Sequence, residues 1–247
     1  MPRYLTKSRF KLALDCPAKL FYTGKPQYPD KSQDDAFLEA LAEGGFQVGA
    51  LAKCYYPTGI DVTERGYDIP LQKMQELLSN ANVTIFEGAF KHKNLFIRAD
   101  IIEKNANNIN LLEVKSSSFD GTDRNDMLTK KGFIDSGWSE YIYDVAFQKY
   151  VITRAHPDWN VHAYLMLANK NSVCTVAGLN QKFLLKTVEV ERTVVQIVGD
   201  VSREGLGDEI LIRVCVDDLV NMNKWKPLNP LILLPCRFKR SFVFYCN

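Results

Sequence analysis

The chain has 247 residues, of which 31 are lysine or arginine and 29 are aspartate or glutamate, so its formal net charge is +2. Hydrophobic residues make up 46% and charged residues 24%, which is ordinary for a soluble globular protein and excludes a disordered, collagen-like or disulfide-dense chain. No apolar run reaches the ~20 residues that cross a bilayer, and the chain does not open on an apolar secretory segment. We therefore expect a cytoplasmic protein without a membrane partner. The near-zero net charge also excludes a purely electrostatic nucleic-acid binder.

The first half of the chain predicts helices followed by strands. Apolar residues at helical spacing predict a helix over residues 39–53, and a second, short helix is expected over residues 72–80. Three strand-like runs follow over residues 83–90, 95–103 and 109–115. Short polar turns separate these runs, which is typical of antiparallel hairpins.

A long polar stretch over residues 116–137 comes next, and its length indicates a functional or mobile segment. The clearest helix then covers residues 139–155, and a strongly apolar strand covers residues 161–168. The pattern weakens afterwards, and residues 187–198 and 209–216 are compatible with further strands or helices. The order of helix, three strands, helix and strand predicts an α/β fold in which helices cover a sheet.

Acidic and basic side chains gather on the second and third predicted strands. Glu113 and Lys115 project from the same face of their strand because side chains alternate, and Asp100 lies on the preceding strand. If the two strands pair, two carboxylates and an ammonium converge. Carboxylates are the ligands that Mg²⁺ prefers, and the backbone carbonyl of Val114 would add a third oxygen. The pattern predicts phosphodiester hydrolysis, in which Lys115 positions the attacking water or stabilises the developing charge.

Each of these features has a structural alternative. Glu113 and Lys115 are also compatible with a surface ion pair. On the helix over residues 139–155, Gln148 interrupts an apolar stripe that contains Tyr141, Val145 and Ile152. Gln148 is therefore either an amide directed at the site or a boundary residue at the rim of the stripe.

In their order along the chain, several segments resemble the PD-(D/E)XK nucleases. The closest resemblance is to the RecB-type branch that includes CRISPR-associated exonucleases and an uncharacterised bacterial family. The segments are Glu87-Gly88-Ala89-Phe90, Ala99-Asp100-Ile101-Ile102, Leu112-Glu113-Val114-Lys115-Ser116-Ser117 and Val145-Ala146-Phe147-Gln148. The opening residues 5–20, which contain Cys16-Pro17, are similar to the start of the same branch.

The resemblance covers residues 1–170 and implies a restriction-endonuclease-like core, a mixed central sheet flanked by helices. Residues 171–247 would then be a C-terminal extension that belongs to a longer or a truncated domain. The resemblance implies a Mg²⁺- or Mn²⁺-dependent enzyme that hydrolyses DNA, at ends or in single strands, in an exonuclease-like manner. By the same resemblance Asp100 and Glu113 are metal ligands, Lys115 is catalytic and Gln148 is the motif glutamine.

The chain departs from the family pattern at two positions. Many RecB-type members place a histidine ligand on the first helix, where this chain has Val48 or Gly49, and Glu43 and Glu87 are the acids that would substitute for it. The tyrosine that often follows the motif glutamine is replaced by Ile152. These departures keep a second hypothesis open, a catalytically inactive DNA-binding or assembly module with the same fold. A third hypothesis is a small-molecule- or protein-binding domain with a surface ion-pair network.

Cysteine spacing bears on one further cofactor. Iron–sulfur members of the branch use one N-terminal and three C-terminal cysteines as cluster ligands. Cys16 stands at the first of these positions, and Cys236, Cys246 and the more distant Cys215 are the C-terminal candidates. Because the compact C-terminal spacing is absent, the sequence favours a free or structural thiol at Cys16 over an iron–sulfur cluster.

Overall fold

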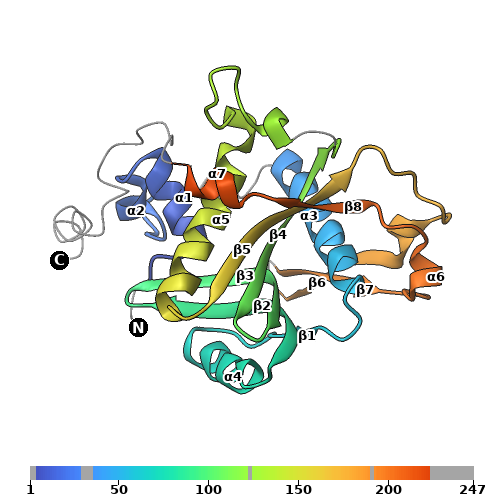
Figure 1. Ribbon diagram of the computed structural model, residues 1–247, viewed down its shortest axis with the longest axis horizontal. Coiled ribbons are helices and arrows are strands. Elements are labelled where there is room, and N and C mark those ends of the chain that lie inside the picture. Colours follow the sequence, from blue (N-terminus) through green and yellow to red (C-terminus); the bar gives the residue numbers. More distant parts are fainter. Residues whose placement is uncertain (1–3, 29–35, 122–123, 190–191, 223–247) are drawn as a thin grey trace.

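The computed structural model describes residues 4–28, 36–121, 124–189 and 192–222. A six-stranded sheet of order β1-β2-β3-β4-β5-β8 lies at its centre, and a separate two-stranded ribbon is formed by β6 and β7 (Figure 1). The strands are β1 (Ile60–Asp61), β2 (Asn82–His92), β3 (Leu95–Asn105), β4 (Asn108–Phe119), β5 (Asn160–Asn169), β6 (Phe183–Glu189), β7 (Arg192–Ile197) and β8 (Leu211–Cys215). The α-helices are α1 (Lys7–Asp15), α2 (Lys19–Tyr22), α3 (Ala36–Cys54), α4 (Asp68–Leu78), α5 (Ser136–Ala155), α6 (Arg203–Leu206) and α7 (Asp217–Asn221), and the 3₁₀ turns are η2 (Arg124–Met127) and η3 (Leu179–Lys182).

The strands β2, β3 and β4 form the antiparallel hairpins that the sequence predicts. Each hairpin closes through a two-residue turn, and the first residues of these turns, Lys93 and Ala106, have positive φ angles of 53° and 52°. Positive φ at this position is the geometry of the primed turns, whose twist matches that of the strands. β4 then pairs in parallel with β5, and β5 pairs in antiparallel fashion with β8. The sheet is therefore mixed, and the predicted α/β class is confirmed.

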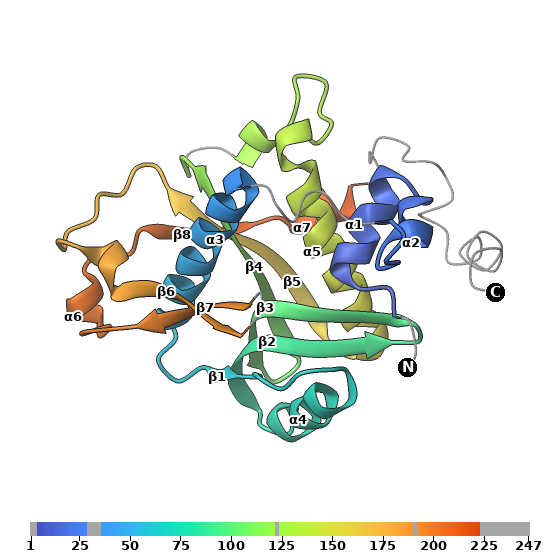
Figure 2. The same cartoon turned by 180° about the vertical axis from the view of Figure 1, so that it is seen from behind.

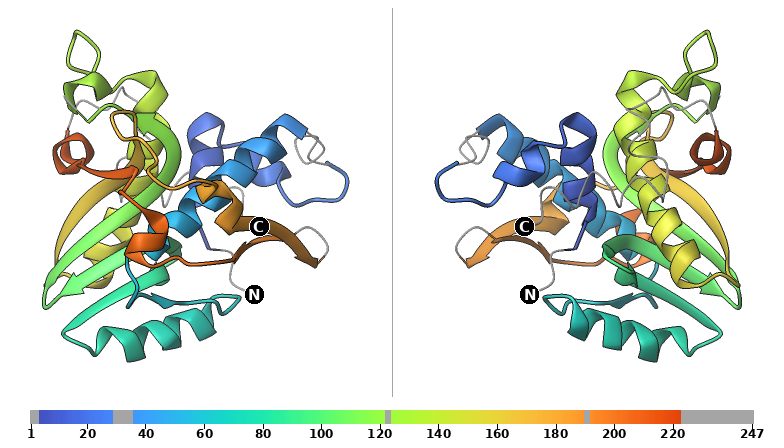
Figure 3. Two further views of the ribbon diagram at one scale, coloured as in Figure 1. Left: turned by 90° about the vertical axis from the view of Figure 1, so that its right-hand side faces the viewer. Right: turned by 90° about the vertical axis from the view of Figure 1, so that its left-hand side faces the viewer.

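Helices cover both faces of the sheet (Figures 2 and 3). α5 packs on β2, β3 and β5, while α3 packs on β4 from the opposite face and also contacts the β6–β7 ribbon. One apolar core surrounds α4 and α5 and includes Met74 and Val145. A second core lies beneath α3 and includes Leu51, Phe86 and Leu112. The burial of Leu112 agrees with the prediction that Glu113 and Lys115 face away from it.

The helix α5 connects β4 to β5 and sets the position of the site. Asp135 caps its first turn, since the Asp135 carboxylate accepts the backbone N–H of Gly137 at 2.9 Å. The predicted stripe of Val145, Gln148 and Ile152 is buried at 0% exposure for each residue. The polar Gln148 therefore lies inside the core, between the helix and the sheet.

Some element boundaries differ from the predictions. The helix expected over residues 72–80 begins earlier, at Asp68, because Pro70 is tolerated in a first helical turn, and it ends at Leu78. The helix expected over residues 39–53 is slightly longer. Residues 187–198, for which the sequence allows either a strand or a helix, contribute to the β6–β7 hairpin.

Residues beyond position 170 also contribute to the central sheet, since β8 pairs with β5. The predicted boundary between the core and the C-terminal extension, at residue 170, therefore falls between two strands of one sheet. The apolar and basic end of the chain, residues 228–247, lies outside the described residues. In the described part of the chain, none of the helices combines the length and the apolar character needed to cross a bilayer.

Candidate active site

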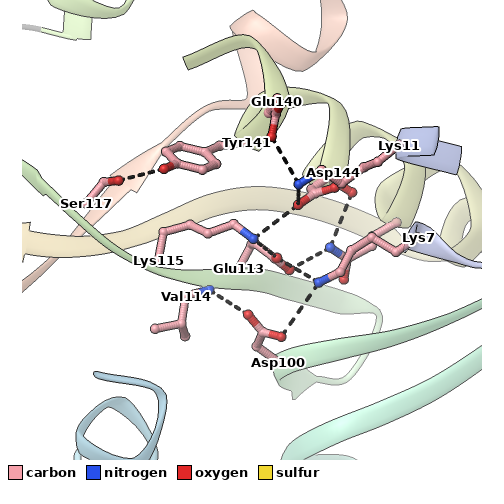
Figure 4. Close-up of polar contacts among 11 residues, drawn as sticks. Lys7, Lys11, Asp100, Glu113, Val114, Lys115, Ser117, Glu140, Tyr141 and Asp144 are labelled. Atoms are coloured by element: carbon pink, nitrogen blue, oxygen red, sulfur yellow. Dashed lines mark hydrogen bonds and ion pairs between the residues drawn. The ribbon is translucent and has the colours of Figure 1, made fainter. Parts of the chain in front are cut away.

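The site begins where β3 and β4 separate. Ile101 and Leu112 are the last paired residues on this side of the two strands, so Asp100 and Glu113 stand where the strands diverge. The Asp100 carboxylate accepts the backbone N–H of Val114 at 2.8 Å, in place of a carbonyl oxygen of β3 (Figure 4). This hydrogen bond holds Asp100 against β4, beside Glu113, as the hairpin prediction requires.

Glu113 is the centre of a buried hydrogen-bond network. Its Oε1 accepts from the ammonium groups of Lys7 at 2.7 Å and Lys115 at 2.6 Å, and its Oε2 accepts from Gln148 Nε2 at 2.6 Å. Its exposed fraction is 0%. A carboxylate is buried in ionised form only where cations and donors satisfy it. The alternative prediction, that Glu113 forms an ion pair on the surface, is therefore wrong, because Glu113 is buried.

Gln148 and Asp144 lie one turn apart on α5 and share the face that meets β4. Both are buried, with exposed fractions of 0% and 1%, so the rim position that the sequence allowed for Gln148 is wrong. Lys115 Nζ lies 3.1 Å from Asp144 Oδ2 and thus bridges Asp144 and Glu113. Asp144 is not among the predicted site residues, although its position four residues before Gln148 places it on the same helical face.

The N-terminal helix α1 brings two further lysines to the carboxylates (Figure 4). Lys7 Nζ lies 2.7 Å from Glu113 Oε1 and 3.9 Å from Asp100 Oδ1. Lys11, one turn later, lies 3.9 Å from Asp144 Oδ2. Neither lysine is among the predicted site residues. Lys7 and Glu113 are 106 positions apart, and no local pattern marks a contact over that separation.

The start of α1 is fixed by two sets of contacts. The backbone of Leu5 accepts the N–H of Phe96 at 3.1 Å, which attaches the N-terminal segment to β3. The ring of Phe10 stacks on that of Phe147 of α5, with 4.5 Å between the centroids. Because Lys7 lies between these two anchors, its backbone is held beside the site.

The site lines a cleft of about 1150 Å³. Residues of α3, the central sheet and β7 surround this cleft. Asp100, Glu113, Lys115 and Lys7 all line it. On α3 the aromatic ring of Phe46 lines the same cleft and is 45% exposed. The carboxylates are therefore buried or partly buried in the protein but border a space that a large ligand can enter.

Glu87, the acid that the sequence offered as a substitute ligand, has an unusual backbone. Its φ of 54° lies in the left-handed region, which a residue with a side chain rarely adopts inside a strand. Its carboxylate lies 3.4 Å from Lys53 Nζ and lines the same cleft, close enough for its charge to help raise the pKa of Asp100. Glu43, the other candidate, lies on α3 and is absent from the described residues that line the cleft.

The two central carboxyl groups have pKa values displaced in opposite directions. Burial, together with the charge of Glu113, raises the pKa of Asp100 to about 7. Burial alone would raise the pKa of Glu113 as well, but the ammonium groups of Lys7 and Lys115 outweigh it and lower that pKa to about 2. Burial also raises the pKa of Asp144, against the nearby charge of Lys115. Paired acids whose pKa values are pushed apart in a cleft are typical of functional sites.

The donor set fits a divalent cation. Mg²⁺ and Mn²⁺ prefer oxygen ligands, and Mg²⁺ is usually held by one or two carboxylates together with substrate phosphates. A cation is already attracted to this place, because the Lys7 ammonium contacts both Asp100 and Glu113. Val114, the predicted third ligand, lines the cleft beside them. The described residues contain no group of three or more His, Cys, Asp or Glu side chains arranged for a metal.

The cysteines that bear on an iron–sulfur cluster are not gathered in the described part of the chain. Cys16 follows the last turn of α1 and is an exposed free thiol. Cys215 on β8 is also exposed and free. Cys236 and Cys246 lie outside the described residues.

Comparison of the chain with protein-family models, with curated proteins and with solved structures found no match. The functional assignment therefore depends on the residues of the site itself.

Proposed function

We propose that this protein is a nuclease of the RecB-type PD-(D/E)XK class, which uses Mg²⁺ or Mn²⁺ to hydrolyse phosphodiester bonds of DNA. The observation that carries the proposal is the convergence of Asp100, Glu113 and Lys115 on one cleft, with Gln148 bonded to Glu113 from beneath. The order of the elements supports a restriction-endonuclease-like core. The helix α3 precedes an antiparallel β2–β3–β4 meander, and α5 then crosses over to β5, which pairs in parallel with β4.

In this proposal each residue has a distinct part. Asp100 and Glu113 hold the ion, which when bound supplies an activated water and neutralises charge on the reacting phosphate. Lys115 is held by Glu113 and Asp144, so its ammonium is oriented before the substrate arrives and donates to the oxygen on which charge develops. Gln148 fixes the Glu113 carboxylate through its Nε2 hydrogen bond.

The lining of the cleft supports a nucleic acid as substrate. Basic side chains that include Lys53 and Arg65 line it together with an equal number of acidic ones, and these basic side chains are the groups that would contact phosphates. The exposed ring of Phe46 offers a surface on which an unpaired base can stack. Stacking requires a base that is free of its duplex, which favours single strands or DNA ends.

A catalytically inactive DNA-binding or assembly module is the second candidate. The observation that favours it is that three donors of the protein already occupy the oxygens of Glu113. Such a module would bind DNA with an affinity that falls steeply with salt, without cutting it.

The test is a cleavage assay with the full chain on linear single-stranded, linear double-stranded and circular single-stranded DNA, in Mg²⁺, Mn²⁺ or EDTA. We expect cleavage in either metal and none in EDTA, and a requirement for free ends would identify an exonuclease. Glu113→Gln and Lys115→Met should lower the rate by about 10²-fold or more, as expected for the loss of a charge-stabilising group. Glu103→Gln is the matched control, because Glu103 lies on the same strand as Asp100 but pairs with Arg213, and it should retain activity.

Cleavage at the wild-type rate by purified Glu113→Gln would refute the proposal. Salt-dependent DNA binding by a wild-type protein that does not cleave in any metal would identify the inactive module. If the chain bound neither DNA nor a divalent cation, both candidates would be excluded and a small-molecule- or protein-binding domain would remain.

A further inference from the structure

A lysine of the N-terminal helix occupies the place between the two carboxylates. Figure 4 shows the Lys7 ammonium between Asp100 and Glu113. Its Nζ lies 3.9 Å from Asp100 Oδ1 and 2.7 Å from Glu113 Oε1. Lys115 contacts Glu113 too, but its second contact is with Asp144, on the side of α5. Lys7 is therefore the ammonium that bridges the proposed metal ligands.

The hydrogen bonds of Glu113 fill the acceptor sites of Oε1, the oxygen nearest to Lys7. A carboxylate oxygen offers about two lone-pair sites. Oε1 accepts from both Lys7 and Lys115, and Oε2 accepts from Gln148, whose side chain is fully buried. A cation that contacts Glu113 through Oε1 and also contacts Asp100 must take the position that the Lys7 ammonium holds.

Electrostatics makes simultaneous occupation unfavourable. Mg²⁺ binds its oxygen ligands at about 2.0–2.1 Å. The Lys7 ammonium lies 2.7 Å from one of those same oxygens, so ion and ammonium would be neighbours in a partly buried site. Two positive groups at such a distance repel more strongly than in bulk water, because water screens them less.

The side chain of Lys7 can withdraw without any movement of the fold. Its backbone is anchored through Leu5 and Phe10, whereas its ammonium sits at the end of a flexible four-carbon stem. The Lys7 side chain is 25% exposed and lines the open cleft, so a rotamer change carries the charge into solvent.

We propose that Lys7 is a built-in competitor of the divalent cation at this site. Its ammonium neutralises Asp100 and Glu113 when the ion is absent and withdraws when the ion binds, so α1 sets the affinity of the site for metal. This inference rests on the proposed function, because it requires Asp100 and Glu113 to hold the ion.

The experiment is isothermal titration calorimetry of MnCl₂ into the full chain, without DNA. Lys7→Ala and Lys7→Met should bind Mn²⁺ at least about tenfold more tightly than wild type, because a like charge beside the site is removed. Lys7→Arg keeps the charge and should keep the weaker affinity of the wild type. Lys19→Ala is the matched control, since Lys19 pairs with the exposed Asp15 away from the site, and its affinity should not change.

A second readout is thermal unfolding with and without MnCl₂. A ligand that binds only the folded state stabilises it by RT ln(1 + [L]/Kd), so a tighter site gains more at the same Mn²⁺ concentration. Mn²⁺ should therefore raise the Tm of Lys7→Met more than that of wild type. Lys7→Met retains most of the apolar stem of Lys7 and thereby guards against a packing defect.

Equal or weaker Mn²⁺ binding by Lys7→Ala and Lys7→Met overturns the inference. If wild type still binds Mn²⁺ and Glu113→Gln abolishes that binding, the metal site of the proposed function survives this failure. If neither wild type nor any Lys7 variant binds Mn²⁺, the inference and the metal site fall together.

Discussion

Asp100→Asn removes one ionisable carboxyl group from the site, and its effect on stability can be measured with no metal present. Burial and the charge of Glu113 raise the pKa of Asp100 from 3.8 to about 7. The folded state therefore binds a proton more tightly than the unfolded state, and the stability that this provides is lost as pH rises through about 7. An asparagine does not ionise, and its side-chain oxygen can still accept the N–H of Val114. We expect Asp100→Asn to be more stable than wild type at alkaline pH.

The size of the effect follows from the pKa. One pKa unit is worth about 1.36 kcal/mol, so a rise from 3.8 to about 7 corresponds to roughly 4 kcal/mol of unfolding free energy at pH 8. The Asp100 side chain is 26% exposed and its contact with Lys7 is lost in the variant, so we expect a net gain of about 2–4 kcal/mol. At pH 5 the folded wild type is mostly protonated, and the gain should fall to less than half of its value at pH 8.

The assay is urea denaturation in EDTA at pH 5, 6, 7 and 8, followed by tryptophan fluorescence. Trp138 and Trp159 both pack against the core around α5 and report its loss. The reasoning is refuted if Asp100→Asn is less stable than wild type at pH 8, or if the difference between them does not shrink towards pH 5.

Three other variants probe the scaffold around the site. Burial would raise the pKa of Asp217, but hydrogen bonds from Lys149 and from the backbone N–H of Ala163 outweigh it and lower that pKa. The stability that the ionised carboxylate provides is therefore present above its unfolded pKa and is lost as pH falls. Asp217→Asn should therefore cost about 1–2 kcal/mol at pH 7 and little at pH 3, measured by urea denaturation. Phe10→Ala removes the ring that stacks on Phe147 at 4.5 Å, and should cost about 1–3 kcal/mol in thermal unfolding while loosening α1. In Gly59→Ala the new Cβ would lie 2.1 Å from Phe86 Cζ, and the forced shift of a buried ring should cost about 1–3 kcal/mol in calorimetry.

Distinct results would contradict these expectations. A stability loss for Asp217→Asn that is constant between pH 7 and pH 3 would exclude an ionic role for that carboxylate. An unchanged Tm for Phe10→Ala would mean that the stacked rings do not anchor α1. An unchanged Tm for Gly59→Ala would show that the Phe86 ring moves aside without cost.

Local periodicity is enough to predict the scaffold of the site. Glu113 and Lys115 are two residues apart in a strand, so their shared face follows from the alternation of side chains. Gln148 interrupts a helical stripe, which left it either directed at the site or at the rim, and its burial in the structure decides for the inward position. Both inferences depend on neighbours in sequence, whose relative directions the backbone geometry determines.

The tertiary structure alone decided which other charges join Asp100, Glu113 and Lys115 at the site. The Lys7 ammonium reaches Glu113 from 106 positions away, and the burial of Glu113 depends on α1 and α5 closing over β4. The separation of β3 and β4 at Asp100, which frees the N–H of Val114 for the carboxylate, also depends on the packing of the whole sheet. Long-range contacts leave no periodic trace in a single sequence. The sequence by itself therefore predicted the two carboxylates and Lys115 as a group, and the fold decided that a lysine of the N-terminal helix lies between the carboxylates.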